Sequence, residues 1–220
     1  MSVTGLGGYP GVFAKDPEAF RNSLRKVKAL VFDWDGVFNK GEKTQAGHSG
    51  FSEPDSMGVN LLRFAFWLRD GETLPVAAII SGARNEMAEL YARREHFHSV
   101  VTGIKQKDLA LKALCTTYHI EPEEIAFFFD DIIDLGAAKL AGVRIFFAHP
   151  SAMATRKWVV ANGLFDYMPG HQAGEGALRE TCEMMLTEMG LFDQVVQYRM
   201  AFSGAYERYL QLRDSVATVM

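Results

Sequence analysis

The sequence predicts an α/β protein, a Rossmann-like three-layer sandwich with a mainly parallel central sheet. Short apolar runs alternate along the chain with segments in which apolar residues recur at helical spacing. Two of the apolar runs end directly in clusters of aspartates, at the edge where open α/β sheets bind their ligands. Strands that alternate with helices at this spacing indicate right-handed βαβ units, and such units build a parallel sheet.

The individual elements follow the same alternation. A first helix is expected over residues 16–26, because Asp16-Pro17 is a good helix start. Stretch 41–54 reads as polar and irregular, and the aromatic last thirty residues read as helical. The expected strands span residues 29–34, 76–80, 99–102, 125–129 and 143–147, with a short apolar segment at 165–168. Further helices are expected from about 61 to 70, over 85–94, 106–118 and 135–141, around Trp158, and over 176–189.

Composition narrows the classes of function. The chain has 220 residues, 48% of them hydrophobic, which is ample for a buried core. A net charge of −4 without a dense basic run argues against nucleic acid or an anionic membrane as the main partner. The start does not resemble a secretory signal and no run approaches a membrane span, so we expect a cytoplasmic protein. Cys115 and Cys182 lack metal-ligand spacing and are expected to be free, buried thiols.

Five aspartates follow two of the predicted strands. Asp33 and Asp35 follow the first, and Asp130, Asp131 and Asp134 follow the strand at 125–129. Either cluster alone is more often a solvated loop or a helix cap, but two clusters at the same sheet edge favour a shared site. Converging carboxylates repel, so a divalent cation is expected there, and oxygen-only ligands favour Mg²⁺. The pattern therefore predicts Mg²⁺-assisted phosphoryl chemistry.

Two pieces between the clusters suit a phosphate group. Ser81-Gly82 ends the predicted strand at 76–80 and offers a hydroxyl beside a flexible backbone. Lys105 and Lys107 lie near the start of the helix at 106–118, where a cation could neutralise phosphate. Each feature alone is weak, since a Ser-Gly pair is usually a turn and such a lysine is usually solvated.

Taken in their order along the chain, the two aspartate clusters, the Ser81-Gly82 pair and the two lysines resemble the four motifs of the haloacid dehalogenase superfamily of phosphohydrolases. The resemblance covers roughly residues 30–147. The most specific motif is Asp33-Trp34-Asp35-Gly36-Val37. The resemblance implies that Asp33 is the nucleophile that forms an aspartyl-phosphate and that Asp35 is the general acid and base. It also implies a Mg²⁺ ion held by Asp33, the backbone carbonyl of Asp35 and Asp130.

The resemblance assigns roles to the remaining site residues as well. Ser81, Gly82 and Lys107 would bind the phosphate, with Lys105 as the alternative lysine. Lys107 would also take part in catalysis, and Asp134 would orient it. Supporting roles fall to Asp131, Asp134, Arg84 and Arg179.

The gaps between the motifs narrow the resemblance further. Neither gap has room for a large cap domain, so the domain at 28–189 is expected to be capless, with an extension at 1–27 and a helical extension at 190–220. The turn Gly174-Glu175-Gly176 and the helix start after it, which carries Arg179, are similar to the family of 3-deoxy-D-manno-octulosonate 8-phosphate and acylneuraminate 9-phosphate phosphatases. That family implies a homo-oligomer, a tetramer, in which such tails help close a neighbour's site.

Three features depart from the family pattern. Phe129 replaces the usual Gly before the acidic pair, Arg84 is shifted by one position after Ser81-Gly82, and stretch 41–54 lacks the alternating apolar pattern of the family's assembly hairpin. The first departure concerns the metal loop, and the last concerns the assembly of the tetramer.

The main hypothesis is a Mg²⁺-dependent phosphatase of a small phosphorylated metabolite, of the octulosonate 8-phosphate or nonulosonate 9-phosphate type. One alternative is a catalytically weak relative that serves as a binding or scaffold protein, suggested by Phe129 and the aromatic C-terminal segment. Another is a phosphatase of a different small or macromolecular phosphate ester, admitted by an open site.

Overall fold

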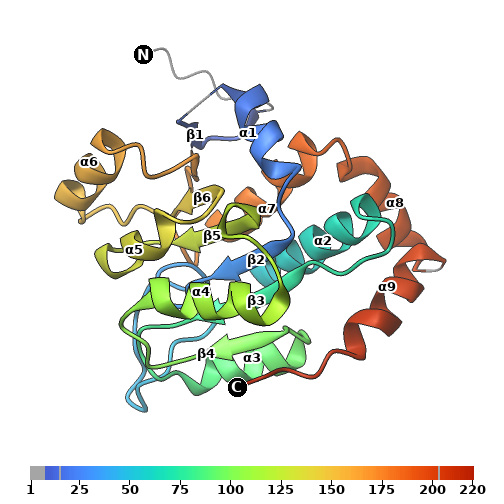
Figure 1. Ribbon diagram of the computed structural model, residues 1–220, viewed down its shortest axis with the longest axis horizontal. Helices are drawn as coiled ribbons and strands as arrows, with labels where there is room; N and C mark the ends of the chain where they lie inside the picture. The colour runs from blue at the N-terminus through green and yellow to red at the C-terminus, as the bar shows by residue number, and fades with distance from the viewer. Residues whose placement is uncertain (1–7, 15, 203) are drawn as a thin grey trace.

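A seven-stranded sheet of order β1-β7-β6-β5-β2-β3-β4 forms the centre of the computed structural model, which describes residues 8–14, 16–202 and 204–220 (Figure 1). All neighbouring strands are parallel except β1, which pairs antiparallel with β7. The predicted α/β fold with a mainly parallel sheet is confirmed. The strands are β1 (Val12–Phe13), β2 (Ala29–Phe32), β3 (Val76–Ile80), β4 (Ser99–Val101), β5 (Ile125–Phe129), β6 (Val143–Phe146) and β7 (Tyr167–Met168).

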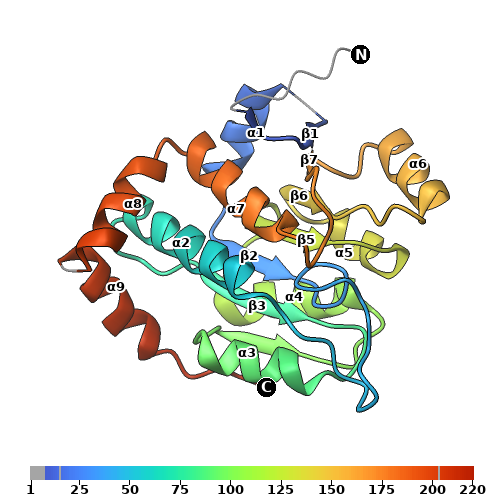
Figure 2. The same ribbon diagram turned by 180° about the vertical axis from the view of Figure 1, so that it is seen from behind.

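Helices cover both faces of the sheet and complete the three layers (Figures 1 and 2). On one face lie α1 (Pro17–Leu24), α2 (Glu53–Arg69), α3 (Glu86–Arg94), α7 (Ala177–Glu188), α8 (Phe192–Ala201) and α9 (Ala205–Asp214). On the other lie α4 (Lys107–Tyr118), α5 (Leu135–Ala138) and α6 (Met153–Ala161), with short 3₁₀ turns at Pro122–Glu124 and Ile132–Asp134.

Strand β2 illustrates why the sequence adopts this arrangement. Leu30 and Phe32 pack into one hydrophobic cluster and Ala29 and Val31 into the other, because successive side chains point to opposite faces of a strand. All four are fully buried, as expected for a parallel sheet that is covered on both sides. The charged residues that follow β2 therefore emerge at the edge of a rigid, apolar support.

Where the structure describes them, the two segments expected to be extensions share the core of the main domain, whereas residues 1–7, 15 and 203 lie outside the described part of the chain. Strand β1, which the sequence analysis did not predict, adds a strand beside β7, and the Phe13 ring lies 4.8 Å from that of Tyr167. The C-terminal segment is helical as expected, but it forms two helices, α8 and α9, which Phe202 separates by its left-handed backbone conformation. Tyr206 and Tyr209 are buried against α2.

The C-terminal residues cover the open edge of the sheet at β4. The backbone N–H of Val100 donates to the carbonyl of Val219, at 2.9 Å, and the N–H of Val219 donates to the carbonyl of His98, at 3.0 Å. An uncovered edge strand can pair with another chain, so this contact blocks one route of association.

Within the described residues, no helix is both long enough and apolar enough to cross a membrane.

Helix α2 begins about eight residues earlier than its apolar periodicity predicts. The hydroxyl of Ser52 accepts the backbone N–H of Asp55, at 3.2 Å, and so caps the helix. Between Trp34 and this cap the chain runs through turns and bends, in agreement with the prediction of an irregular stretch. No cap domain is inserted in the described segments 33–52 and 81–85.

Candidate active site

The predicted site residues follow the central strands at the carboxyl edge of the sheet. Phe32, the last residue of β2, lies opposite Phe128 of β5 and Ile79 of β3. The next positions after these strands are therefore neighbours in space, and they hold Asp33, Asp130 and Ser81. This is the edge at which α/β sheets bind ligands, so the register of the strands builds the site.

Three carboxylates meet at this edge. Oxygen atoms of Asp33, Asp130 and Asp134 all lie within 4.8 Å of one another. Asp33 and Asp134 are buried, while Asp130 is half-buried. We call these three residues the aspartate triad.

Lys107 supplies the positive charge of the aspartate triad. Its Nζ atom lies 2.7 Å from Oδ1 of Asp33 and 2.5 Å from Oδ1 of Asp134, and its side chain is fully buried. Lys107 is the first residue of α4, so the helix start directs it inward, whereas Lys105 lies in the preceding loop and is exposed. Of the two lysines that the sequence left open, only Lys107 reaches the acids.

Burial makes the charge of this site costly. Desolvation raises the pKa of Asp33 to about 7, helped by the neighbouring Asp134 and opposed by Lys107. Desolvation also raises the pKa of Asp130 to about 9, with contributions from Asp33 and Asp134. Burial acts to lower the pKa of Lys107, but the two carboxylates together hold it above its usual value.

The residues of the triad fit a divalent cation. Three carboxylates face one ammonium group, so the fully ionised site carries excess negative charge in a largely buried position. A divalent cation offsets that charge, and an all-oxygen donor set is the kind that Mg²⁺ prefers.

Gly36 allows the loop after β2 to approach the triad closely. Its φ of +79° lies in the left-handed region, and a Cβ atom there would lie 1.9 Å from Oδ2 of Asp130. Any other residue at position 36 would displace the carboxylate from the triad.

The remaining two acids point elsewhere, which corrects the expectation that all five carboxylates converge. Asp131 is exposed and accepts the backbone N–H of Ile132, at 2.7 Å, as a helix cap. The carboxylate of Asp35 is held instead by Lys43 and Ser49. Asp134 also orders the loop, because it accepts the backbone N–H of Asp131, at 3.1 Å.

Ser81 and Gly82 lie beside Lys107. The Ser81 side chain is buried, and its hydroxyl has no hydrogen-bond partner within the described part of the chain. A Cβ atom on Gly82 would lie 3.9 Å from Cε of Lys107. A buried hydroxyl without a partner is costly, so Ser81 is suited to donate to a bound oxygen.

Neither predicted supporting arginine contacts the triad. Arg84 is exposed, and its Cγ atom lies 3.2 Å from the place a Cβ on Gly103 would occupy. Arg179 forms an ion pair with Glu183 along α7, at 2.6 Å between Nε and Oε1, and its backbone N–H donates to Asp55. Arg179 therefore joins α7 to the start of α2 and does not line the cleft at the triad.

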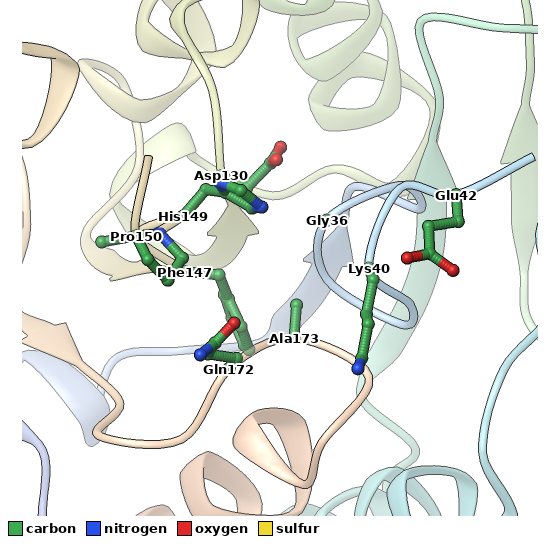
Figure 3. A pocket seen from close by; sticks show the side chains of 10 residues that line it. Gly36, Lys40, Glu42, Asp130, Phe147, His149, Pro150, Gln172 and Ala173 are labelled. Carbon is green, nitrogen blue, oxygen red and sulfur yellow. The ribbon is translucent and has the colours of Figure 1, made fainter. Parts of the chain in front are cut away.

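A cleft with a volume of about 290 Å³ opens beside Asp130 (Figure 3). In Figure 3, Asp130, His149 and Pro150 lie on one side, Lys40 and Glu42 on the other, and Gln172 and Ala173 below. The remaining lining residues are Gly36, Phe147 and Ala148. Apart from Asp130, the polar lining residues were not predicted from the sequence, because Lys40, Glu42, His149 and Gln172 come from three distant segments and share no pattern. The glycine-rich turn after Ala173 was the one sequence feature that marked this region.

Phe129 does not enter this cleft. Its ring stacks between Phe127, at 5.6 Å between ring centres, and Phe146, at 5.2 Å, in the cluster that faces α4 and α5. The strand register is kept, since the carbonyl of Phe129 accepts the N–H of Phe147, at 2.8 Å.

The chain is similar in sequence to known phosphatases. No protein-family model matches the chain. The 3-deoxy-D-manno-octulosonate 8-phosphate phosphatase of Escherichia coli K12 is 26% identical over 171 residues, which cover 76% of this chain and 84% of that enzyme. Relatives of this kind are, by their names, phosphoric monoester hydrolases.

Solved structures agree with the curated relatives. The phosphatase of the same name from Moraxella catarrhalis, in complex with magnesium, phosphate and KDO, superposes with a TM-score of 0.68 at 24% identity and covers 86% of this chain and 100% of its own. A putative HAD family hydrolase from Streptomyces avermitilis superposes with a TM-score of 0.59 at 27% identity and covers 74% of this chain and 93% of its own. The chain has the haloacid dehalogenase fold. The resemblance predicted from the motifs is confirmed by these relatives.

Proposed function

We propose that the chain is a Mg²⁺-dependent phosphomonoester hydrolase that works through an aspartyl-phosphate on Asp33. The observation that carries this proposal is the buried contact of Lys107 with Asp33 and Asp134. The single positive charge of Lys107 does not balance the three carboxylates of the triad. We propose as substrate a small phosphorylated sugar acid, of the octulosonate 8-phosphate or nonulosonate 9-phosphate type. The names of the relatives support that choice.

Magnesium would be held by Asp33 and Asp130, with the backbone carbonyl of Asp35. When bound, it would offset the charge of the carboxylates and of the substrate phosphate.

The side chains divide the two steps between them. An oxygen of Asp33 attacks phosphorus, the bond from phosphorus to the leaving alcohol breaks, and Asp35 gives the alcohol its proton. Lys107 and Ser81 hold the equatorial oxygens, with the backbone of Gly82 beside them. In the second step Asp35 takes a proton from water, whose oxygen attacks phosphorus and releases phosphate from Asp33.

We propose that substrate specificity comes from the cleft and from neighbouring subunits. We propose a cytoplasmic homo-oligomer, a tetramer by resemblance, because a capless cleft leaves the substrate open to solvent. Sedimentation of the purified protein tests the assembly. A monomer would contradict it and would leave the cleft accessible to large substrates such as a phosphoprotein.

Phosphate release from a panel of sugar acid, hexose and nucleotide phosphates tests the activity. With Mg²⁺ we expect hydrolysis, highest on sugar acid phosphates, and with a chelator in place of Mg²⁺ we expect activity to fall by about 100-fold or more. Failure to hydrolyse any ester in Mg²⁺ would contradict the proposal and favour a binding protein.

Magnesium should stabilise the protein more at high pH than at low pH. The pKa values of Asp33 and Asp130 are raised from 3.8 to about 7 and about 9, so the folded protein keeps protons that the unfolded chain has lost. Without metal, the free energy of unfolding therefore decreases as the pH rises from about 3.8 to about 9. Because Mg²⁺ must displace these protons, its binding strengthens over the same range.

Thermal denaturation with and without saturating MgCl₂ measures this effect. We expect a larger increase in Tm near pH 8.5 than near pH 6, and Asp130→Asn should remove most of the difference. An equal increase at both pH values in the unmodified protein would contradict the assignment of these carboxylates to the metal.

A further inference from the structure

The carboxylate of Asp35 is held outside the aspartate triad by two donors from the irregular loop that follows β2. The hydroxyl of Ser49 donates to Oδ1, and the Nζ of Lys43 donates to Oδ2. Ser49 is 1% exposed, although it lies in a loop whose neighbouring residues are mostly exposed. Such burial of a polar residue is uncommon in a surface loop and indicates a specific role.

The direction of the Ser49 hydrogen bond is fixed by its neighbours. The Ser49 oxygen lies 2.7 Å from Nδ2 of Asn85 and 3.2 Å from each of Nζ of Lys43 and Nε1 of Trp34. These nitrogen atoms can only donate, so none of them can accept the hydroxyl proton, and they compete for the two lone pairs of the Ser49 oxygen. The single proton of Ser49 is therefore directed to Asp35.

Asn85 is itself fixed at the start of α3. Its Oδ1 atom accepts the backbone N–H of Met87, at 3.1 Å, as the helix cap, and this leaves Nδ2 to face Ser49. Asn39 holds the loop from the other side, because its Nδ2 donates to the carbonyl of Gly50, at 3.0 Å. The position of Ser49 is thus determined by the start of α3 and by an earlier residue of its own loop.

We propose that Ser49 and Lys43 are positioning residues for Asp35, with Asn85 orienting the Ser49 hydroxyl. The proposal rests on the proposed function and extends it to residues outside the four motifs. Ser49 and Lys43 donate to the two oxygens of Asp35 and so hold this carboxylate as a hydrogen-bond acceptor. The second step needs an acceptor at this place, because Asp35 takes the proton of the attacking water. Lys43 is 36% exposed, so it can move away when the leaving alcohol takes its place.

Loss of either donor should slow release of phosphate from Asp33 more than its transfer to Asp33. We expect Ser49→Ala and Lys43→Met to show a burst of p-nitrophenol from p-nitrophenyl phosphate, equal in amount to the enzyme, before a steady state that is about 10- to 100-fold slower than wild type. Ser49→Thr and Lys43→Arg keep the donors and should recover most of the steady-state rate. Thr44→Ala removes a hydroxyl from the same loop without touching Asp35 and should behave as wild type.

Rapid mixing of p-nitrophenyl phosphate with each variant in MgCl₂ measures both phases. A burst in Ser49→Ala and Lys43→Met, with recovery in the conservative variants, supports the proposal. The proposal would be overturned if both variants showed the kinetics of the wild type, or if both phases were slowed equally. In either case, turnover by the wild-type enzyme would leave the proposed function intact. No turnover by the wild type would refute the proposed function and this inference together. Exposed Lys43 serves as the second test should Ser49→Ala fold poorly.

Discussion

Replacing Asp33 with asparagine is expected to lower kcat by about 10⁴-fold or more, because an amide oxygen cannot form a stable acyl-phosphate. Asp33 is buried at the end of the central strand β2, and it is in contact with Lys107. Steady-state hydrolysis of p-nitrophenyl phosphate in excess MgCl₂ measures the effect, and circular dichroism confirms that the variant is folded.

Asp131→Asn is the matched control for this substitution. It removes a carboxylate from the neighbouring loop, but Asp131 is exposed and only caps a 3₁₀ turn. We expect its activity to remain within about 10-fold of wild type. Activity of Asp33→Asn close to wild type would contradict the assignment of the nucleophile.

Lys107→Met should impair both activity and folding. Removing the ammonium leaves Asp33 and Asp134 without their buried partner, and such a loss commonly costs about 3–5 kcal/mol of stability. It also removes a cation from the place where phosphate charge would develop, so we expect kcat/KM to fall by about 10³-fold. Urea denaturation and steady-state kinetics measure the two effects separately.

Lys105→Met is the control that separates the two candidate lysines. Lys105 is exposed in the loop before α4, so we expect a change of at most a few-fold in kcat/KM and about 0.5 kcal/mol or less in stability. A large loss in Lys105→Met with a small loss in Lys107→Met would reverse the assignment of the phosphate lysine.

The parts of the fold that could be predicted from the sequence are those specified by local patterns. Strands such as β2 and β5 are continuous apolar runs, and their burial on both faces follows from that composition. Asp33 and Asp130 follow these runs directly, so their meeting at one sheet edge required only that the strands be parallel neighbours. The same reasoning could not choose between Lys105 and Lys107, because the choice depends on the residue at which α4 begins.

Other features depend on contacts between distant segments and leave no pattern in the sequence. Strand β1 has only two residues and exists because β7 offers it an edge. Ser49 acquires its role from Asn85, which lies 36 positions away along the chain. The sequence also could not show which carboxylates meet at the site. Asp131 is adjacent in sequence to a member of the triad, but it turns outward and caps a 3₁₀ turn.

The proposed mechanism is tested most directly by finding which residue holds the phosphoryl group during turnover. Wild-type protein is mixed with a phosphate ester in MgCl₂, quenched with acid within milliseconds, digested and analysed by mass spectrometry, with Ser49→Ala as a second sample in which we expect the intermediate to accumulate. We expect a phosphoryl group on Asp33 that is labile to base and absent from the Asp33→Asn variant. Turnover with a phosphoryl group on another residue, or undiminished turnover by Asp33→Asn, would contradict it.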